Sequence, residues 1–519
     1  MKIWLDPALL LYEYAISNHG GHPTSEPDCP VDCPKDDGPD DRAPELGRID
    51  MHNIFPVGLT EVDRYYLHTR TFMRPQALHI QACGEDLWLA CNPSESGKVV
   101  LMDAEAHTLL ESFRTPKTLR DAVAGSSICS SSVEQGVELF AVAGFLQEPT
   151  QPALPPSLEQ AQTLSVWFHI TNACNLRCHY CYVDKTTEHM ADNTAKQAVD
   201  AIIRSASKHG YRRVKLKYAG GEAALRLPQI IAVHDYALEQ TRQHGLELSA
   251  SLLSNGTILP VRAIQQLKER QIGIMISLDG IGAHHDQQRP LLNGKGSFAL
   301  IDRTITRLLA HDLVPYINVT VTQRNLDELP ALMAYILQRD LPFGLSYYRD
   351  NECSTHLTNL QYRDTQMIEG MRAVFAYIAD HLPRRRLLSS LVDKADTNGP
   401  HQYACGVGRN YFAVDQRGGI AKCQMAITQT LTTIHADDPL RLIREDRDGV
   451  QGLPVDEKEG CRSCQWRYWC RGGCPMQTYR MTGRNDIKSP NCAIYKALFP
   501  EALRLEALRL LKYELPVIC

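Results

Sequence analysis

Residues 165–185 read SVWFHITNACNLRCHYCYVDK, an apolar run followed by three closely spaced cysteines. The run SVWFHIT is rich in β-branched and aromatic residues, which is typical of a buried strand. Cys174, Cys178 and Cys181 follow it with the spacing C-x3-C-x2-C. We therefore expect a strand that ends in a loop carrying three thiol groups.

Downstream of this strand, strand-like and helix-like segments alternate at a nearly constant period. The strand candidates are residues 165–171, 213–220, 247–254, 272–280, 315–322 and 343–349. The helix candidates between them are residues 194–210, 228–245, 261–271, 298–312 and 326–340. Six β–α repeats predict a parallel sheet, curled or open, so the expected fold class is α/β with a partial (β/α)6 barrel over residues 160–352. The chemistry of such barrels lies at the C-terminal ends of the strands.

The composition narrows the class of protein. The chain has 519 residues, which is too long for one ordinary core and favours two to four domains. Its net charge of −5 gives no electrostatic argument for binding nucleic acid or an anionic membrane. No segment approaches the roughly 18 apolar residues of a membrane span, and residues 1–20 lack the pattern of a signal peptide. These features predict a cytoplasmic protein.

The cysteines point to metal binding. The chain contains 17 of them, and in a reducing compartment such a number is not a disulfide framework. Three thiolates on one loop suit an iron–sulfur cube, which would keep one iron without a protein ligand, as a catalytic metal site requires. The alternatives are a zinc site, which usually uses paired C-x2-C knuckles, or reduced core thiols.

The cysteine spacing, with Tyr180 before the third cysteine, resembles the signature of the radical S-adenosylmethionine (SAM) superfamily. The resemblance implies that SAM chelates the open iron of a 4Fe–4S cluster. It further implies that one electron cleaves SAM to a 5′-deoxyadenosyl radical, which abstracts a hydrogen atom.

Further residues carry the same resemblance. Gly220, Gly221 and Glu222 end the second strand; the resemblance implies that this turn contacts the methionine amino group, and an ordinary turn is the alternative. Glycines at such a place let the backbone come close to a ligand. Ser277, in ISLDG, and Arg289, at the end of HDQQR, are candidates for polar contacts to SAM, although both could equally fix loops. Asn255, after the third strand, is a weaker candidate.

A second group of cysteines follows the barrel. It has the pattern C-x12-G-x4-C, then C-x2-C-x5-C-x3-C, then x17 and a last cysteine. The cysteines of this pattern are Cys405, Cys423, Cys461, Cys464, Cys470, Cys474 and Cys492, and its glycine is Gly418. A zinc ribbon is physically reasonable. The arrangement resembles the SPASM domain, which follows radical SAM cores and carries two auxiliary 4Fe–4S clusters.

The SPASM resemblance implies two ligand sets. The outer cluster would take Cys461, Cys464, Cys470 and Cys492, and the inner cluster Cys405, Cys423 and Cys474. The inner set is one ligand short, so that position is open to substrate or filled by a distant residue. Cys353, just past the sixth strand, is the candidate for this position and for a role on the catalytic face; an ordinary free thiol is the alternative.

The region before the barrel predicts a small α/β domain over residues 49–150. LWLACN and KVVLMD alternate like paired strands, and AEAHTLLESF, TLRDAVAG and SVEQGVELFAVAGFL have helical periodicity. Residues 85–147 resemble the recognition element of enzymes that modify ribosomally made peptides (RiPPs), a winged-helix-like fold that binds the leader of a precursor peptide. The resemblance implies capture by strand addition and side-chain pockets, and a purely structural domain is the alternative.

The expected organisation covers the whole chain. Its parts are an N-terminal helix and flexible linker (1–48), the recognition-like domain (49–150), the radical SAM core (160–352), a helical connector (353–400), the SPASM domain (401–495) and a C-terminal helix (496–519).

Together these resemblances imply a peptide maturase. A hydrogen atom would be removed from a Cα or Cβ of the precursor peptide, and oxidation through the auxiliary clusters would complete a thioether or carbon–carbon crosslink. Backbone excision and epimerisation remain open. The implied partners are the precursor peptide, bound by the N-terminal domain, and a flavodoxin- or ferredoxin-like electron donor.

Two other functions are weighed against this one. An anaerobic sulfatase-maturating enzyme, which forms formylglycine, usually has Asp after the second SPASM cysteine, where this chain has Gln424. A non-catalytic iron–sulfur or zinc protein that binds a peptide would need a fourth protein ligand beside the first three cysteines. The turn at Gly220 and the presence of Tyr180 argue against it.

Overall fold

The computed structural model describes residues 1–5, 69–94, 97–149, 161–354, 356–514 and 517–518. They form two compact units, which are described separately: Met1–Asn92 with Lys98–Ala153 and Glu514–Cys519, and Pro93–Gly97 with Leu154–Tyr513. Residues 6–48 of the predicted N-terminal helix and flexible linker (1–48) lie outside the described residues. Among the described helices, none combines the length and the hydrophobicity needed to cross a membrane.

The first unit contains an antiparallel sheet with the strand order β16-β1-β5-β4-β3. The strands are β1 (Lys2–Leu5), β3 (His79–Ala82), β4 (Leu87–Cys91), β5 (Val99–Asp103) and β16 (Val517–Ile518), and a separate pair joins β2 (Thr71–Phe72) to β6 (Lys117–Thr118). The predicted pairing of β4 with β5 is confirmed. Strands β1 and β16 were not predicted, because segments this short carry too little periodicity and gain their partners only through the fold.

Three helices pack on this sheet, as the sequence periodicity predicts. They are α4 (Ala104–Ser112), α5 (Leu119–Ala124) and α6 (Ser130–Val142). Asp103 caps α4 by accepting a hydrogen bond from the Ala106 backbone, and Thr118 and Asp121 form a capping box at the start of α5. The helices and the sheet share one apolar core, which includes Ile3.

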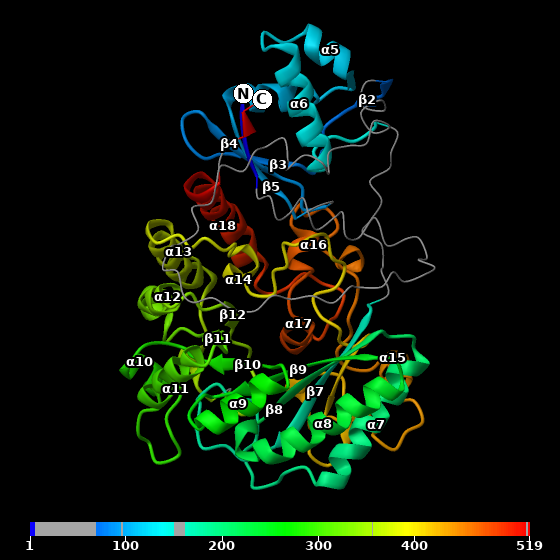
Figure 1. The fold of residues 1–519 in the computed structure, drawn as a ribbon, viewed down its shortest axis with the longest axis vertical. Coiled ribbons are helices and arrows are strands. Elements are labelled where there is room, and N and C mark those ends of the chain that lie inside the picture. The colour runs from blue at the N-terminus through cyan, green and yellow to red at the C-terminus, as the bar shows by residue number, and fades with distance from the viewer. Residues whose placement is uncertain (6–68, 95–96, 150–160, 355, 515–516, 519) are drawn as a thin grey trace, which may run out of the picture. The chain divides into compact units, whose positions relative to one another are not determined.

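The second unit is built on a nine-stranded sheet with the order β12-β11-β10-β9-β8-β7-β13-β14-β15 (Figure 1). Its first six strands are β7 (Thr163–Thr171), β8 (Arg213–Gly220), β9 (Glu247–Ser254), β10 (Ile272–Ser277), β11 (Tyr316–Val321) and β12 (Phe343–Tyr347). Neighbouring strands from β7 to β12 are all parallel, in the order of the sequence. The predicted run of six β–α repeats is therefore confirmed.

The helices between these strands lie close to their predicted positions. They are α7 (Asp192–Lys208), α8 (Leu227–Gln243), α9 (Val261–Glu269), α11 (Phe298–Ala310) and α12 (Leu329–Gln338). Helix α7, for example, buries Ala195, Val199 and Ile202 and leaves Lys196 exposed. The repeats also contain a short helix that was not predicted, α10 (Ala283–Gln288), and the 3-10 turns η1 (Ala223–Arg226) and η2 (Leu326–Glu328).

A hairpin after the six repeats extends their sheet. Strands β13 (Tyr411–Val414) and β14 (Gly419–Ala421) are antiparallel, and β15 (Thr432–Thr433) follows them. Gly418 has a φ of 87° in the turn, a backbone conformation that glycine adopts without strain. Strand β13 pairs in parallel with β7, so the barrel sheet continues into the second cysteine region.

The rest of this unit consists of helices and turns. The elements are η3 (Thr358–Leu360), α13 (Asp364–Asp380), α14 (Leu388–Leu391), η4 (Gln424–Ala426), α15 (Pro439–Glu445), η5 (Val455–Glu457), α16 (Arg467–Cys470), α17 (Pro475–Thr482) and α18 (Cys492–Tyr513). Helix α18 begins at Cys492, ahead of Pro500 and ahead of the C-terminal helix predicted over 496–519. Proline is typical of a helix start, but Ile494 and Leu498 are buried and hold the preceding turns in helical form.

Candidate active site

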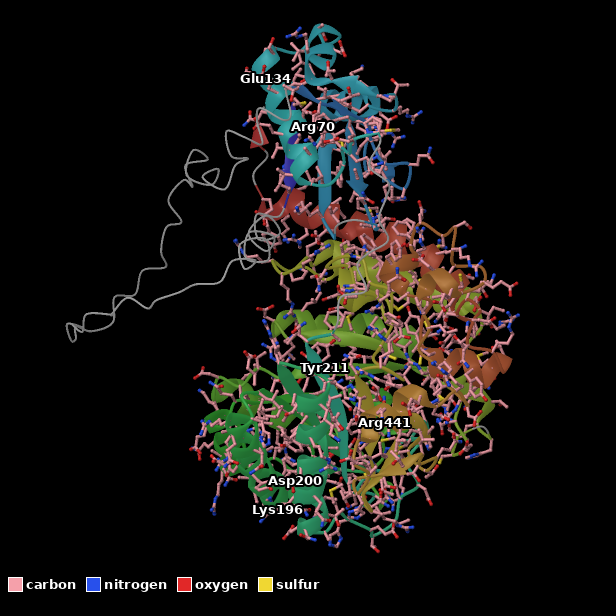
Figure 2. All side chains as sticks on the ribbon, turned by 90° about the vertical axis from the view of Figure 1, so that its right-hand side faces the viewer. Arg70, Glu134, Lys196, Asp200, Tyr211 and Arg441 are labelled. Atoms are coloured by element: carbon pink, nitrogen blue, oxygen red, sulfur yellow. The ribbon has the colours of Figure 1, made fainter. Side chains whose placement is uncertain are left out.

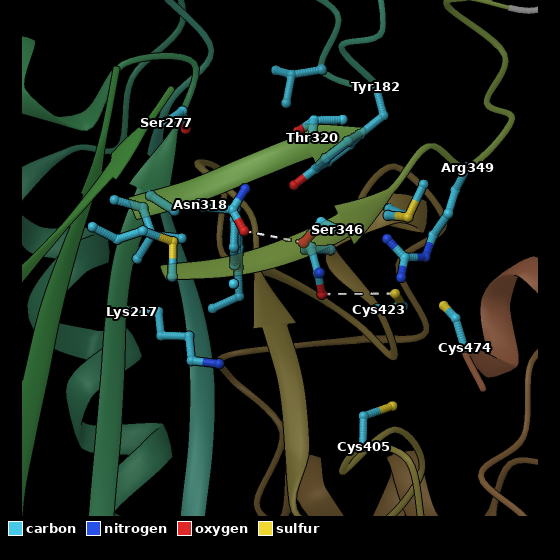
Figure 3. Close-up of a pocket in the computed structure, with 18 of the residues that line it drawn as sticks. Tyr182, Lys217, Ser277, Asn318, Thr320, Ser346, Arg349, Cys405, Cys423 and Cys474 are labelled. Atoms are coloured by element: carbon cyan, nitrogen blue, oxygen red, sulfur yellow. Dashed lines mark hydrogen bonds between the residues drawn. The ribbon is translucent and has the colours of Figure 1, made fainter. Parts of the chain in front are cut away.

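A cavity of about 1000 Å³ lies in the second unit. Its wall includes the first three cysteines, Cys174, Cys178 and Cys181, together with the three predicted inner-cluster cysteines, Cys405, Cys423 and Cys474. Figure 3 shows the last three at one end of the cavity. Two groups of cysteines that are more than two hundred residues apart in the sequence therefore face one space.

The turn after β8 packs directly against the first cysteine loop. The Gly221 backbone donates to the Thr171 carbonyl (2.7 Å), and the Glu222 backbone donates to the Ala173 carbonyl (2.8 Å). A Cβ atom on Gly220 would lie 2.3 Å from the Thr171 oxygen, and one on Gly221 would lie 2.4 Å from the Ala173 oxygen. Both glycines line the cavity, but what first requires them is the close approach of two backbone segments.

Glu222 joins the ends of β8 and β9. Its buried carboxylate accepts hydrogen bonds from the Ala224 backbone (2.9 Å), the Ser254 hydroxyl (2.8 Å) and the Asn255 backbone (2.6 Å). Burial raises the pKa of Glu222, and these hydrogen bonds oppose the shift. The Asn255 amide in turn donates to the Asn175 side chain (2.9 Å), which lies on the cysteine loop. Asn255, a weaker candidate in the sequence, thus helps to position this loop.

A buried network holds the other side of the loop. The Tyr180 hydroxyl donates to Asp279 (2.5 Å), and the Arg289 guanidinium contacts both Tyr180 and Asp279. Asp279 also accepts from the Thr320 backbone (2.8 Å). Asp279 was not predicted from the sequence, and its signal is a charged residue just past a buried strand. Arg289 is fixed by protein partners, and both Arg289 and Ser277 line the cavity.

The surroundings of the thiols fit iron–sulfur ligation. Burial raises the pKa of Cys178 to about 12, and the charge of Arg289 opposes this shift. A thiolate is the metal-binding form, so a nearby cation or a bound metal is needed to stabilise it. Within the described residues, no three His, Cys, Asp or Glu side chains converge as the ligands of a single metal ion. A cube separates its ligands more widely, because each thiolate binds a different iron.

The predicted outer set of cysteines is also brought together. The charges of Cys461, Cys464 and Cys492 all act on Cys470, and burial is the largest cause that raises its pKa to about 12. Lys458 is almost fully buried close to this set and also lies within electrostatic reach of Cys405 and Cys474 of the inner set. The two predicted sets are therefore neighbours, with a lysine near both.

Cys353 lies elsewhere. Its side chain is exposed, it is not part of the cavity wall, and its thiol donates to the Tyr182 carbonyl at 3.6 Å. The thiol with which it interacts electrostatically is Cys181. The structure thus groups Cys353 with the first cysteine loop and not with Cys405, Cys423 and Cys474. Its role as their fourth ligand remains a prediction without a contact to carry it.

An ion pair that sequence reasoning missed borders the inner set. Arg349, after β12, binds Asp393 at 2.7 Å, and both side chains are largely buried. Burial by itself would raise the pKa of Cys474, but the charges of Arg349 and Lys394 bring it below its usual value. The pair was not predictable, because 44 residues separate its members in the sequence.

Residues 168–336 match the family model of the Radical SAM superfamily. The chain is 23% identical over 350 residues to a serine-type anaerobic sulfatase-maturating enzyme of Klebsiella aerogenes, covering 64% of this chain and 83% of that one. It is 24% identical over 356 residues to a PqqA peptide cyclase of Granulibacter bethesdensis, covering 63% and 86%. It shares its fold with anSMEcpe, solved with bound AdoMet and the Cp18Cys peptide, at 19% identity, with a TM-score of 0.54 over 67% of this chain and 99% of that one.

This match defines the class of domain that the six β–α repeats form. Residues 168–336 are a domain of the Radical SAM type, and the chain is an enzyme. The two relatives reported above, which are named as an anaerobic sulfatase-maturating enzyme and a PqqA peptide cyclase, are SPASM-type radical SAM enzymes.

Proposed function

We propose that this enzyme is a maturase that modifies a ribosomally made precursor peptide by radical chemistry, forming a thioether or a carbon–carbon crosslink. The observation that carries the proposal is one cavity lined by both Cys178 and Cys423, and so by members of both cysteine groups. Its volume of about 1000 Å³ is at the upper end of the range for small-molecule pockets, so it has room for a substrate side chain beside a cofactor. The peptide named in the PqqA cyclase relative supports a substrate of this class.

The residues of the first group would hold the cofactor in place. Cys174, Cys178 and Cys181 would bind a 4Fe–4S cluster, and the turn at Gly220 would face SAM. Bound together, these cofactors supply one-electron chemistry that removes a hydrogen atom from an unactivated carbon. The buried contacts of Tyr180 and Arg289 keep the loop rigid, which holds the thiols at fixed positions.

The second group would hold the auxiliary clusters. Cys461, Cys464, Cys470 and Cys492 form a complete set of four ligands, whereas Cys405, Cys423 and Cys474 leave one position open toward the cavity. Cluster potentials depend on burial and on nearby charge, and Arg349 and Lys394 provide positive charge beside Cys474. A flavodoxin- or ferredoxin-like protein would deliver the first electron.

The first unit would bind the leader of the precursor. Strand β3 is an edge strand of the described sheet, with β4 as its one neighbour. Peptide recognition by strand addition takes place at the edge of a sheet. Helices α4 and α6 supply the apolar packing on which such a sheet depends.

Sulfatase maturation is the second candidate, because one of the relatives is named for it. The site offers an argument against it. Gln424 follows Cys423, and its side-chain oxygen accepts from the Tyr411 hydroxyl (2.5 Å) and from the Cys423 thiol (3.7 Å). An amide in this position cannot take up a proton as a carboxylate would.

The deciding experiment is anaerobic reconstitution with iron and sulfide, followed by reduction and addition of SAM. We expect about twelve irons for three cubes, and 5′-deoxyadenosine on turnover. A short peptide encoded beside the gene should then lose hydrogen, and tandem mass spectrometry should locate a crosslink. Conversion of a sulfatase-derived peptide to formylglycine would favour the second candidate. Failure to release 5′-deoxyadenosine with either substrate would refute both.

A further inference from the structure

The inward positions of the barrel strands include several polar residues. The interior of a β/α barrel is generally filled by bulky branched apolar side chains. Here the strand residues that face the cavity include Ser165, Lys217, Ser251, Ser277, Asn318, Thr320 and Ser346. The Ser346 hydroxyl donates to Asn318 (3.1 Å), as Figure 3 shows. We call the part of the cavity that these strand residues line the chamber.

The cavity as a whole, including the chamber, has more positive than negative side chains in its wall. The cationic lining residues are Lys185, Lys215, Lys217, Arg289, Arg349 and Lys394, and the carboxylates are Glu222 and Asp393. Both carboxylates already have partners. Glu222 accepts three hydrogen bonds, from its own turn and from the end of β9. Asp393 pairs with Arg349. Neither is left to neutralise a further cation in the wall.

Most of the cations have partners at the two cysteine groups. Arg289 pairs with Asp279. Lys185 lies within electrostatic reach of Cys181, and Lys394 has the same relation to Cys423 and Cys474. Lys217 lies within electrostatic reach of Cys405 in the same way. Lys215 and Lys217 are two residues apart on β8 and therefore project from the same face of the strand.

Lys217 is the more enclosed of these two. Its ammonium lies 6.0 Å from the centre of the Tyr411 ring, and among the described residues no acceptor is hydrogen-bonded to it. Burial, followed by the charges of Lys215 and Lys394, lowers the pKa of Lys217 to about 8, and the charge of Cys405 opposes this shift. In Figure 3 its side chain extends from the strand into the cavity. Keeping an ammonium in such a place costs free energy unless an anion accompanies it.

We propose that Lys217, with Lys215 beside it, binds a carboxylate of the peptide substrate inside the barrel. The carboxylate is either an Asp or Glu side chain or the C-terminus of the peptide. The proposal rests on the proposed function, because it concerns the peptide that the cavity receives. It would place an acidic group at the inward face of β8 and so select which residue of the peptide lies near the SAM-binding end.

The test measures binding to the reconstituted holoenzyme with SAM present. The probes are the capped tripeptides acetyl-Gly-Glu-Gly-amide and acetyl-Gly-Gln-Gly-amide, and the uncapped acetyl-Gly-Gly-Gly, whose only carboxylate is its C-terminus. Competition NMR gives the Kd of each. We expect the Glu probe or the C-terminal probe to bind about tenfold or more tightly than the Gln probe, because a charge-assisted hydrogen bond is lost in the Gln probe. Which of the two binds identifies the source of the carboxylate.

Variants assign the effect to the residue. Lys217→Met should abolish the preference, and Lys217→Arg should retain most of it. Lys196→Met removes the same charge from the outer surface of α7 (Figure 2) and should change nothing. If Lys217→Met fails to fold, Lys217→Gln serves in its place, and the comparison of the Glu and Gln probes on the unaltered enzyme still tests the proposal.

Several outcomes would overturn it. Equal affinity of the unaltered enzyme for all three probes would do so, as would a preference that survives Lys217→Met. A tenfold rise in the Kd for SAM in that variant would assign Lys217 to the cofactor's carboxylate instead. Uncoupled 5′-deoxyadenosine formation is measured on the same samples. If it persists while the probes are not discriminated, this inference fails alone; if it is absent from the unaltered enzyme, the proposed function fails.

Discussion

The two cysteine regions of this enzyme are built in different ways. In the first, Cys174, Cys178 and Cys181 lie on one short loop, which hydrogen bonds from neighbouring strand ends hold in place. In the second, seven cysteines are spread from residue 405 to residue 492 and lie in turns and at helix ends. Cys470 ends α16, Cys474 precedes α17 and Cys492 begins α18.

The supports of the two regions differ accordingly. The first loop is tied to the end of α10 and the segment after it by backbone hydrogen bonds, from Arg177 to Pro290 (2.8 Å) and from His179 to Gln288 (3.1 Å). The second region has few regular elements, and α16 and α17 are short. We infer that the barrel fixes the first loop even without a cluster. The turn-rich second region depends on cluster binding for part of its folding free energy. Four predictions test this contrast.

The largest effect is expected for replacing Cys174, Cys178 and Cys181 together by Ala. Formation of 5′-deoxyadenosine, followed by chromatography, should fall to the level of the blank, because no thiolate remains to hold the cluster. The barrel should keep its circular dichroism spectrum. Replacing Cys461 and Cys464 by Ala is the matched control in the other region and should leave SAM cleavage measurable. Equal loss in both variants would contradict the separation of roles.

Removal of iron should affect the second region more than the first. Hydrogen exchange of α16 and α17 in the iron-free protein should be at least about tenfold faster than in the reconstituted protein, because cluster binding contributes to their folding free energy. The strands β7 to β9 should exchange at unchanged rates. Uniform loss of protection across both regions would show that the barrel also depends on its cluster.

Asp393→Asn tests the ion pair that lies between the barrel and the second region. The change leaves Arg349 buried without its counter-charge, which costs about 3–5 kcal/mol. Anaerobic urea unfolding measures this loss. Asp437→Asn removes an exposed partner of Lys208 and serves as the control, with no measurable change expected. Similar urea midpoints for the two variants would mean that the buried ion pair does not stabilise the fold.

The smallest effect is a pH dependence at the support of the first loop. Burial, with the charge of Arg289 adding to it, lowers the pKa of His285 to about 3, while the unfolded chain has the ordinary value near 6.5. Below that ordinary value the unfolded state binds the proton and the folded state does not, so stability falls as the pH falls. The loss should be about 1 kcal/mol between pH 6.5 and 5.5.

His285→Gln should flatten this dependence, and His244→Gln, on the exposed end of α8, should leave it unchanged. The measurement is urea unfolding at a series of pH values. A slope that is the same in all three proteins would show that another group is responsible.

Much of the barrel was predictable because its signals are local. The strands and helices from β7 to β12 were found from alternating periodicity, and the helix segments of the first unit were found in the same way. Strands β1 and β16 and the start of α18 were missed, since their pairing or packing partners are far away in the sequence. The same limit applies to the site. The thiols were predicted from spacing, whereas Asp279, the Arg349–Asp393 pair and Lys217 were not.

By itself, the sequence determined the order of β–α repeats and the spacing of the cysteines, because both are written in neighbouring residues. Only the tertiary structure decided that Cys174 and Cys423 share one cavity, that Cys353 stays outside it, and that Lys217 faces its interior. The reason is physical. These relations depend on which strand ends and turns the fold brings together. No local sequence pattern encodes the distances between residues that are far apart in the chain.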